Sequence, residues 1–392
     1  MDDQAPERLS DYLAARRPPG RARHEGDSVP GPFRSSPVRA RPDADVATGA
    51  PAGHRGCCGR ERGTAQSCVP PVVSVVVPTL RRPELLSRCL KAILTQGFPS
   101  GLYEILVCDD GPDECTEREV RALAHAYPHG PTLQYLPATG ARGPAAARNR
   151  GWRSARSEII AFTDDDTVPH SDWLKQGVLA MSPTVSAVSG RIVMPLPVQP
   201  TDYERDAAGL ADAEFATANC FVRRRALLAV GGFDPRFTSA WREDSDLHFA
   251  LLEKGLVVTP CPLAQVLHPI RPARFAAGLA MQRKVMFDTL LLSKYPALYR
   301  ERIRRRPPWF YLAVTSAVVL ALVALLLRLW WLAGGAGLLW LVLTAIFFRR
   351  RARGTSSRIR DRLDLVLTSA LVPLLSIVWR LVGMARFGPR FP

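Results

Sequence analysis

The stretch EIIAFTDDD, from Glu158 to Asp166, joins an apolar run directly to three consecutive carboxylates. Like charges repel, so keeping three neighbouring acids ionised raises the free energy unless something compensates them. An apolar run of this length is typical of a strand that is buried on both faces of a sheet. We therefore expect a buried strand whose end presents acidic groups to a binding partner.

Similar runs occur upstream, separated by segments with helical spacing. Strands are predicted for VVSVVVP (72–78), YEILVCDD (103–110) and TLQYLP (132–137), and helices for 83–96, 113–127 and 143–155. Strands that alternate with helices over this distance predict an α/β fold with a doubly wound sheet. Ligands of such sheets bind outside the carboxyl ends of the strands, which is where two of these strands carry their acids.

The acids after Thr163 suit a divalent cation. Side chains two positions apart in a strand point the same way, so Asp164 and Asp166 can share a face, with Asp165 turned aside. Mg²⁺ and Mn²⁺ prefer carboxylate oxygens and commonly bind with the phosphates of a substrate. The alternative is a solvated acidic turn that caps the following helix.

The positive charge lies mainly in the last quarter of the chain. Of the net charge of +16, residues 300–392 carry +13, from 16 Arg and three acids. Arginines around long apolar runs are typical of the cytoplasmic edge of a membrane protein. No helix-turn-helix, zinc-finger or RNP-like pattern accompanies them, so nucleic acid is not an expected partner.

The same region contains three apolar runs. Phe310–Leu327 and Leu329–Phe348 are interrupted only by Arg328. Together they would form a helix of roughly 58 Å at about 1.5 Å per residue, twice the thickness of a bilayer core of about 30 Å. A two-helix hairpin with both ends in the cytoplasm fits this length. The third run, Leu363–Trp379, either spans or lies in the interface, because it contains Asp364 and Pro373.

These features divide the chain into four regions. We expect a disordered tail over residues 1–69, a catalytic domain over 70–272, an amphipathic juxtamembrane region over 273–308, and a membrane region with two or three transmembrane helices over 309–392. The N-terminus lacks the apolar segment of a signal peptide, so the catalytic domain is expected in the cytoplasm. Cys57, Cys58 and Cys68 lack paired metal-ligand spacing, and the other cysteines read as reduced, mostly buried thiols.

The ordered set of motifs resembles the GT-A glycosyltransferases of family 2. The resemblance covers roughly Val72 to Pro269 and is carried by VVSVVVPTLRR, ILVCDDG, GPAAARNRGW, FTDDDTVPHSDWL, ANCFVRRRALLAVGGFD and WREDSDL. It implies a GT-A type doubly wound mixed sheet with a Rossmann-like nucleotide-binding half. It also implies a membrane-anchored, inverting and metal-dependent enzyme of the cell envelope.

Residue roles follow from the resemblance. Thr79, Asp109, Asp110, Arg148 and Asp164 match positions that hold the donor nucleotide, and carboxylates and a guanidinium suit ribose, base and phosphate groups. Asp109 and Asp110 can instead form a turn before Gly111, and Arg148 can instead lie on a solvated helix face.

Metal binding is implied for three residues. Asp164 and Asp166 match the DxD motif that presents Mn²⁺ or Mg²⁺ to the diphosphate, and His268 matches a metal-ligating histidine of some relatives. A lone histidine beside a proline can equally be a packed or hydrogen-bonded residue.

The acceptor side is implied for four residues. Asp244 matches the base that deprotonates the acceptor hydroxyl, and Glu243 is its acidic neighbour. An acid cluster at a helix N-terminus is also favoured by the helix dipole alone, which is the alternative. Asn219 and Trp241 fall near the acceptor pocket, although both residue types are more often structural.

The expected function is transfer of a single sugar from a nucleoside diphosphate sugar, with UDP favoured, to a hydroxyl of a membrane lipid or envelope glycan. Processive relatives carry a Q-x-x-R-W helix, and Gln282-Arg283-Lys284-Val285-Met286 lacks that pattern. The alternatives are a polyprenyl-phosphate sugar synthase and a non-catalytic nucleotide-sugar-binding membrane protein. The sequence does not identify the sugar or the acceptor.

Overall fold

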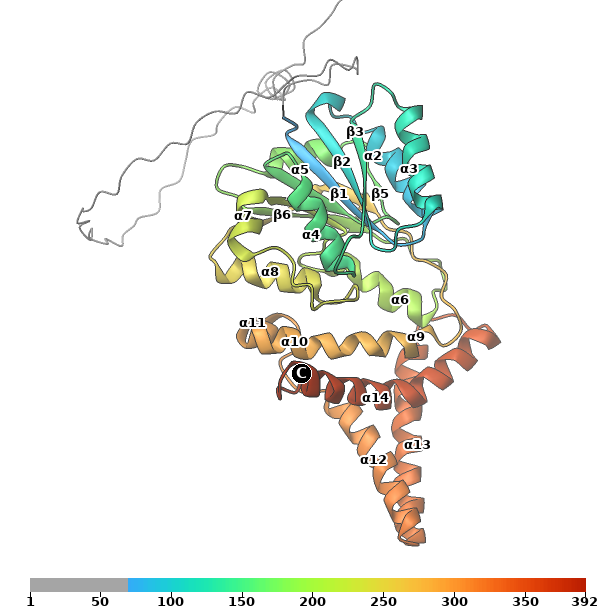
Figure 1. The fold of residues 1–392 in the computed structure, drawn as a ribbon. Helices are drawn as coiled ribbons and strands as arrows, with labels where there is room; N and C mark the ends of the chain where they lie inside the picture. The colour runs from blue at the N-terminus through green and yellow to red at the C-terminus, as the bar shows by residue number, and fades with distance from the viewer. Residues whose placement is uncertain (1–69) are drawn as a thin grey trace, which may run out of the picture. The chain divides into compact units, whose positions relative to one another are not determined.

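The computed structural model describes residues 70–392. The predicted disorder of residues 1–69 and the cysteines at 57, 58 and 68 lie outside the described part. In residues 70–392 one sheet of eight strands forms the centre of the catalytic domain, in the order β3-β2-β1-β4-β7-β6-β8-β5 (Figure 1). The strands are β1 (Val73–Thr79), β2 (Tyr103–Asp109), β3 (Thr132–Pro137), β4 (Ile159–Thr163), β5 (Val168–Pro169), β6 (Ala187–Val193), β7 (Asn219–Arg223) and β8 (Val258–Leu267).

The chain winds outward from β1 in both directions. Strands β2 and β3 follow on one side and β4 on the other, and all four run parallel. Strand β7 is antiparallel to β4 and β6, and β5 is antiparallel to β8, while β6 and β8 are parallel. The predicted α/β doubly wound mixed sheet is confirmed. The carboxyl ends of β1, β2, β4 and β8 therefore all lie at the same edge of the sheet.

The helices of the catalytic domain begin and end close to the predicted positions. Pro83 and Pro144 stand in the first turns of their helices, where a missing N–H group costs nothing. Asp113 caps α3 by accepting from the N–H groups of Cys115 and Thr116. The helices are α2 (Pro83–Leu94), α3 (Glu114–Ala126), α4 (Pro144–Ser154), α5 (Trp173–Ala180), α6 (Asp202–Ala208), α7 (Arg224–Val230) and α8 (Glu243–Glu253).

The main core lies between the sheet and the helices that cover it. Every residue of β2 and β4 is buried, as expected for strands covered on both faces. The ring of Phe162 packs edge-on against Phe233, with centroids 5.3 Å apart. Four of the five cysteines in the described part are buried and none is in a disulfide, which agrees with the predicted reduced thiols.

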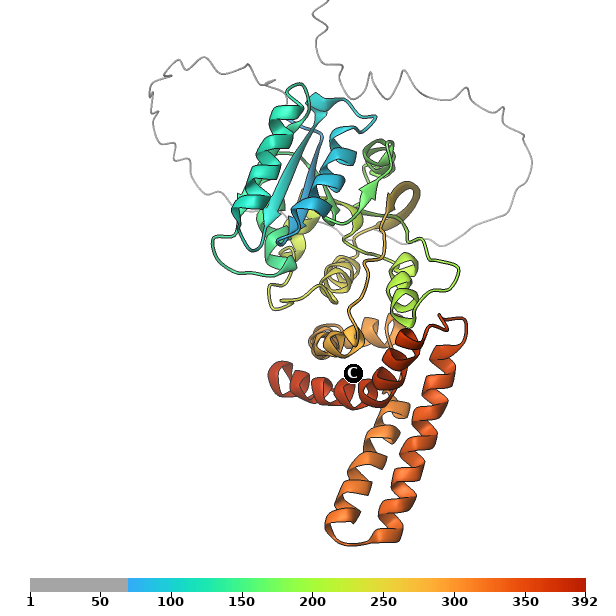
Figure 2. The same ribbon diagram turned by 90° about the vertical axis from the view of Figure 1, so that its right-hand side faces the viewer.

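The C-terminal region contains the predicted hairpin. Helices α12 (Trp309–Leu326) and α13 (Trp330–Ala352) lie side by side and are joined by a turn in which Arg328 has a φ of 57° (Figure 2). Helix α14 (Ile359–Phe387) contains Pro373 and is far more buried than the hairpin helices. All three helices are long and apolar enough to cross a membrane. In both views α14 runs across the direction of the hairpin.

A second core joins α8 to the C-terminal helices. Between the catalytic domain and the hairpin lie α9 (Ala277–Met281), α10 (Met286–Lys294) and α11 (Pro296–Arg302). Residues 286–292 of α10 are all buried, so the apolar side chains of this helix pack inside the protein. Helix α10 packs against α14, and the Phe287 ring lies next to both Phe237 and Phe387 of α14. The cluster also includes Phe249 of α8, with Trp379 and Phe387 of α14 packed against it.

Asn219 holds β6, β7, β8 and α5 together at an irregularity in the sheet. The register between β6 and β8 shifts at Gly190, and a Cβ there would lie 2.3 Å from the Asn219 amide. Asn219 accepts from Trp173 Nε1 at 2.8 Å and donates to the carbonyls of Arg191 and Ala264 at 2.9 and 2.8 Å. Its side chain is fully buried, so it stabilises the sheet.

We predict that Asn219→Ala destabilises the protein by about 2–3 kcal/mol, because it leaves a buried indole N–H and two carbonyls without partners. Thermal unfolding in detergent measures this loss. Donor KM at a temperature where the variant remains folded should change less than about twofold. A raised KM with unchanged stability would instead place Asn219 in the binding site.

Candidate active site

Asp165 ties the acidic turn to the end of β1. Its Oδ2 accepts from the Thr79 hydroxyl at 2.8 Å, and its Oδ1 pairs with Arg82 at 3.2 Å. Burial raises the pKa of Asp165 to about 6 despite the nearby Arg82. Asp165 is therefore the member of the triplet that bonds to β1, and all three acids lie in a turn after β4, which ends at Thr163. Thr79 itself is buried by this contact.

Asp164, Asp166 and His268 form a cluster of possible metal ligands. Each offers one ligand atom, and these atoms lie within 4.8 Å of one another. The pairing of Val168 with Leu267 brings the segments together, since Asp166 precedes β5 and His268 follows β8. The Nε2 atom of His268 lies 3.5 Å from Asp166 Oδ1. Two carboxylate oxygens and one imidazole nitrogen suit Mn²⁺, so the residues present fit a divalent cation.

Arg148 links this cluster to the acids of α8. Its guanidinium lies 2.7 Å from Asp164 Oδ1 and 3.2 Å from Glu243 Oε1. The side chain is almost fully buried, which rules out the solvated helix face. Burial disfavours its charge, yet Asp164 and Glu243 hold the pKa of Arg148 above its usual value. Residues separated by about 95 positions in the chain thus belong to one site.

Glu243 and Asp244 begin α8 beside this arginine. The residue before them, Arg242, has a φ of 73°, a conformation that non-glycine residues seldom adopt. Burial and the neighbouring Asp244 raise the pKa of Glu243 to about 7, against the effect of Arg148. Burial also raises the pKa of Asp244, whose Oδ1 accepts from the N–H of Ser245 at 2.7 Å. The pair can therefore hold or accept a proton near neutral pH.

The acids after β2 have separate environments. Asp109 is fully buried, and its carboxylate accepts from Tyr135 at 2.8 Å and from the N–H of Gly111 at 3.0 Å. Asp110 is only partly buried and accepts from the N–H of Gly143, just before α4, at 2.7 Å. Asp109 thus forms the turn that was the alternative interpretation, while Asp110 is the more accessible carboxylate.

The two residues expected on the acceptor side differ in their surroundings. Asn219 is fully buried with its amide bonded inside the sheet, so it has no group left for an acceptor. Trp241 is partly buried and donates its Nε1–H to Asp288 at 3.1 Å. It lies two residues before Glu243 and packs under the guanidinium of Arg242 at 4.9 Å.

The site contains a cation that the sequence interpretation missed. Arg271 Nε lies 3.1 Å from Asp166 Oδ2, and its side chain is half exposed. It follows His268 by three positions, in the loop after β8. The sequence did contain a signal for this contact, namely a basic residue a few positions after a candidate metal ligand at a predicted strand end.

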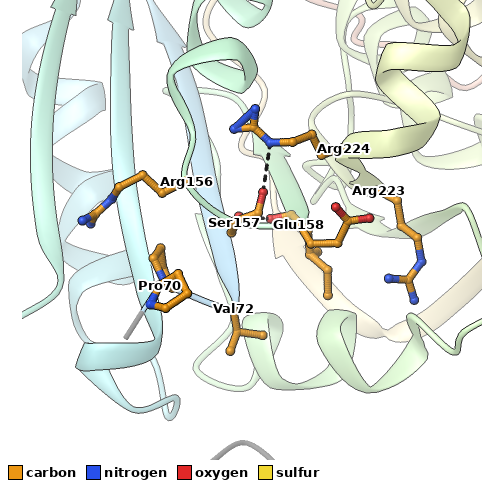
Figure 3. Close-up of a pocket in the computed structure, with 9 residues that line it drawn as sticks. Pro70, Val72, Arg156, Ser157, Glu158, Arg223 and Arg224 are labelled. Carbon is orange, nitrogen blue, oxygen red and sulfur yellow. Dashed lines mark hydrogen bonds between the residues drawn. The ribbon is translucent and has the colours of Figure 1, made fainter. Parts of the chain in front are cut away.

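A hollow of the described residues lies away from these acids. A depression of about 450 Å³ is found where β1 and β4 begin, at the edge opposite the acids (Figure 3). Its arginines are already engaged: Arg224 Nε donates to the carbonyl of Ser157 at 3.2 Å, and Arg156 pairs with Glu104 at 2.7 Å. The hollow is lined by Pro70, Pro71, Val72, Arg156, Ser157, Glu158, Ile159, Arg223 and Arg224.

Two family models match the chain. The one described as glycosyl transferase family 2 matches residues 74–235, and the one described as glycosyl transferase family group 2 matches residues 159–381. The second match covers more than half of the chain and extends through the hairpin into α14.

Similar proteins include glycosyltransferases of an archaeon and of a bacterium. Glycosyltransferase AglE of Haloferax volcanii is 30% identical over 246 residues, which are 58% of this chain and 79% of the relative. The pre-mycofactocin glycosyltransferase of Mycobacterium tuberculosis is 30% identical over 216 residues, or 51% of this chain and 43% of that protein. Among solved structures, the mannosyltransferase PcManGT of Pyrobaculum calidifontis matches with a TM-score of 0.48 and 20% identity, over 81% of this chain and 88% of that one. With family models covering both the catalytic domain and the membrane region, this chain belongs to glycosyltransferase family 2 and is a glycosyltransferase.

Proposed function

We propose that this enzyme transfers a single sugar, with inversion, from a nucleoside diphosphate sugar to a hydroxyl group of a membrane lipid or envelope glycan. UDP is the proposed nucleotide. The observation that supports this most strongly is the position of Arg148, which contacts both Asp164 and Glu243. The carboxylates suited to a diphosphate-bound metal and the acids suited to an acceptor therefore share one site.

On the donor side, Asp164, Asp166 and His268 are the proposed ligands of Mn²⁺ or Mg²⁺. When bound, such an ion supplies Lewis-acid stabilisation of the negative charge that develops on the leaving diphosphate. Asp110 has the accessible carboxylate that can accept hydrogen bonds from ribose hydroxyls or a base N–H. Arg148 pairs with Asp164, and the half-exposed Arg271 provides a positive charge beside Asp166.

On the acceptor side, Asp244 is the proposed base. It would take the hydroxyl proton while the oxygen attacks the anomeric carbon from the face opposite the diphosphate. Its raised pKa makes it a better proton acceptor than an exposed aspartate. Glu243 is held by Arg148 and keeps the first turn of α8 facing the donor carboxylates.

The membrane region supports a lipid-linked or surface-bound acceptor. Helices α12, α13 and α14 are long and apolar enough to cross a bilayer. Arginines flank both ends of the hairpin, so we propose a multi-pass protein whose catalytic domain faces the cytoplasm. The arginines are Arg300, Arg302, Arg304, Arg305 and Arg306 before it, and Arg349, Arg350, Arg351 and Arg353 after it.

We predict that Asp244→Asn lowers kcat by at least about 10²-fold, because the general base is lost, and leaves donor affinity nearly unchanged. Transfer of radiolabelled sugar from a panel of UDP sugars into membranes measures kcat, and calorimetry with UDP measures affinity. Asp246→Asn is the matched control in the same helical turn, where Asp246 pairs with Lys294 at 2.5 Å. An equal loss of UDP binding in Asp244→Asn would contradict the base assignment. Retained turnover with a polyprenyl phosphate as acceptor would favour a polyprenyl-phosphate sugar synthase.

We predict that Asp166→Ala weakens the Mn²⁺-dependent part of UDP binding by at least about 10-fold, because a direct ligand is removed. Calorimetry with and without Mn²⁺ measures that part. Asp165→Asn removes the neighbouring charge but no proposed ligand, so it should retain the difference between the two titrations. Identical titrations of Asp166→Ala and the wild type would refute the ligand set.

Glu243→Gln tests the division of roles between the two acids. The pKa of Glu243 is raised in the folded protein. The stability that its neutral form contributes is therefore fully present below pH about 4.5, the ordinary pKa of this group, and is lost as the pH rises through about 7. The glutamine variant cannot ionise, so its melting temperature should exceed that of the wild type by a few degrees at pH 8 and match it at low pH. It should retain most of the transfer activity at neutral pH. A melting temperature below that of the wild type at pH 8 would show that Glu243 is stabilising when charged.

A further inference from the structure

Asp288 is a buried acid in the first turn of α10. It is 3% exposed and has three partners on two different elements. Its Oδ1 accepts from Arg242 Nε at 2.7 Å and from Trp241 Nε1 at 3.1 Å, and its Oδ2 accepts from an Arg380 guanidinium N–H at 3.3 Å. Burial opposes ionisation, yet Arg242 and Arg380 hold the pKa of Asp288 below its usual value. Asp288 is therefore a charged bridge between the loop before α8 and helix α14.

The loop side of this bridge is strained. Arg242 has φ 73° and ψ −6° and is the residue immediately before Glu243. This conformation is unfavourable for a non-glycine residue, and it persists only where neighbouring contacts enforce it. The bond from its side chain to Asp288 is such a contact. The carbonyl of Arg242 in turn accepts from the N–H of Asp246 at 2.8 Å, so its conformation sets the direction in which α8 begins.

The membrane side of the bridge is tightly packed. The Arg380 side chain is 3% exposed, and its ion-pair partner is Asp288. One turn later, a Cβ on Gly383 would lie 2.7 Å from both the carbonyl oxygen of Met286 and the hydroxyl of Thr289. Helices α14 and α10 therefore approach closely at this point, where glycine allows the contact (Figure 1).

We propose that Asp288 is a positioning residue that couples the docking of α14 on α10 to the geometry of Glu243 and Asp244. The inference rests on the proposed base role of Asp244. Because α14 is one of the three candidate membrane helices, the acids at the start of α8 reach their reactive geometry only when this helix is seated. The hydrogen bonds of the bridge include none of Asp164, Asp166 or His268, so its loss should affect donor binding less than the geometry of Asp244.

The test compares two ion pairs that join a candidate membrane helix to the catalytic domain. Asp288→Asn breaks the bridge. Asp202→Asn is the matched control, because Asp202 of α6 pairs with Arg351 of α13 at 2.6 Å and has no contact with α8. Full-length variants in lipid nanodiscs are assayed for UDP-sugar transfer, UDP affinity and hydrogen exchange of the peptide that contains residues 241–246.

For Asp288→Asn we expect kcat to fall about 10- to 100-fold, the range for a small displacement of a reacting group, with donor KM changed less than about twofold. Hydrogen exchange of residues 241–246 should become faster. Asp202→Asn should lower the melting temperature and leave kcat and this exchange unchanged. Gly383→Ala retains every charged group but separates the helices, so it should give the same pattern with a smaller loss.

Two outcomes would overturn the coupling. One is a kcat for Asp288→Asn that falls no further than that of Asp202→Asn at equal folded fraction. The other is a loss confined to KM. Should Asp288→Asn fail to fold, Gly383→Ala decides by the same two measures. Retained turnover in Asp244→Asn would overturn the base assignment itself. Lost turnover in Asp244→Asn, with normal turnover in Asp288→Asn and Gly383→Ala, would overturn the coupling alone.

Discussion

The buried guanidinium of Arg148 is the interaction on which the arrangement of the site depends. A fully buried cation is tolerated only when it is paired, and here it is shared between Asp164 at the end of β4 and Glu243 at the start of α8. Asp164 and Glu243 each lie close to other carboxylates, and the positive charge of Arg148 offsets part of that repulsion. Arg148 therefore holds the end of β4 near the start of α8. Arg148 lies one turn into α4, and α4 packs on β1 and β2, so the sheet holds the pair in register.

The sheet brings the other groups to the same edge. Strands β4 and β6 are both antiparallel to β7 and β8 is parallel to β6, so the carboxyl end of β8 lies at the same edge of the sheet as those of β1 and β4. The two-residue strand β5 then closes the loop that carries the acids by pairing with the end of β8. The Asp165 carboxylate bonds to Thr79 and Arg82 and so fixes the acidic turn against the end of β1. Asp164 and Asp166 lie on the same side of the turn as His268, where they pair with Arg148 and Arg271.

Between the catalytic domain and the hairpin, α10 is covered on both sides. Its apolar residues complete a core with α8 on one side and α14 on the other. Two charged residues of α10 form ion pairs with other segments. Lys294 pairs with Asp234 and Asp246, and Asp288 pairs with Arg242 and Arg380. Through Asp288 of α10, helix α14 is thus linked by direct contacts to Arg242, the residue before α8. The match of the family model through α14 is consistent with the catalytic domain and these helices forming one functional unit.

Local patterns in the sequence determined the alternation of strands and helices, the hairpin of α12 and α13, and the family. Those features depend on residue spacing, which a single chain displays directly. Only the tertiary structure decided which polar residues meet. It showed that Asn219 is bonded within the sheet, that Asp109 is enclosed by Tyr135, and that Arg271 and Asp288 have partners near the acids. Such contacts depend on strand order, register and close helix packing, which bring together residues that no local pattern relates.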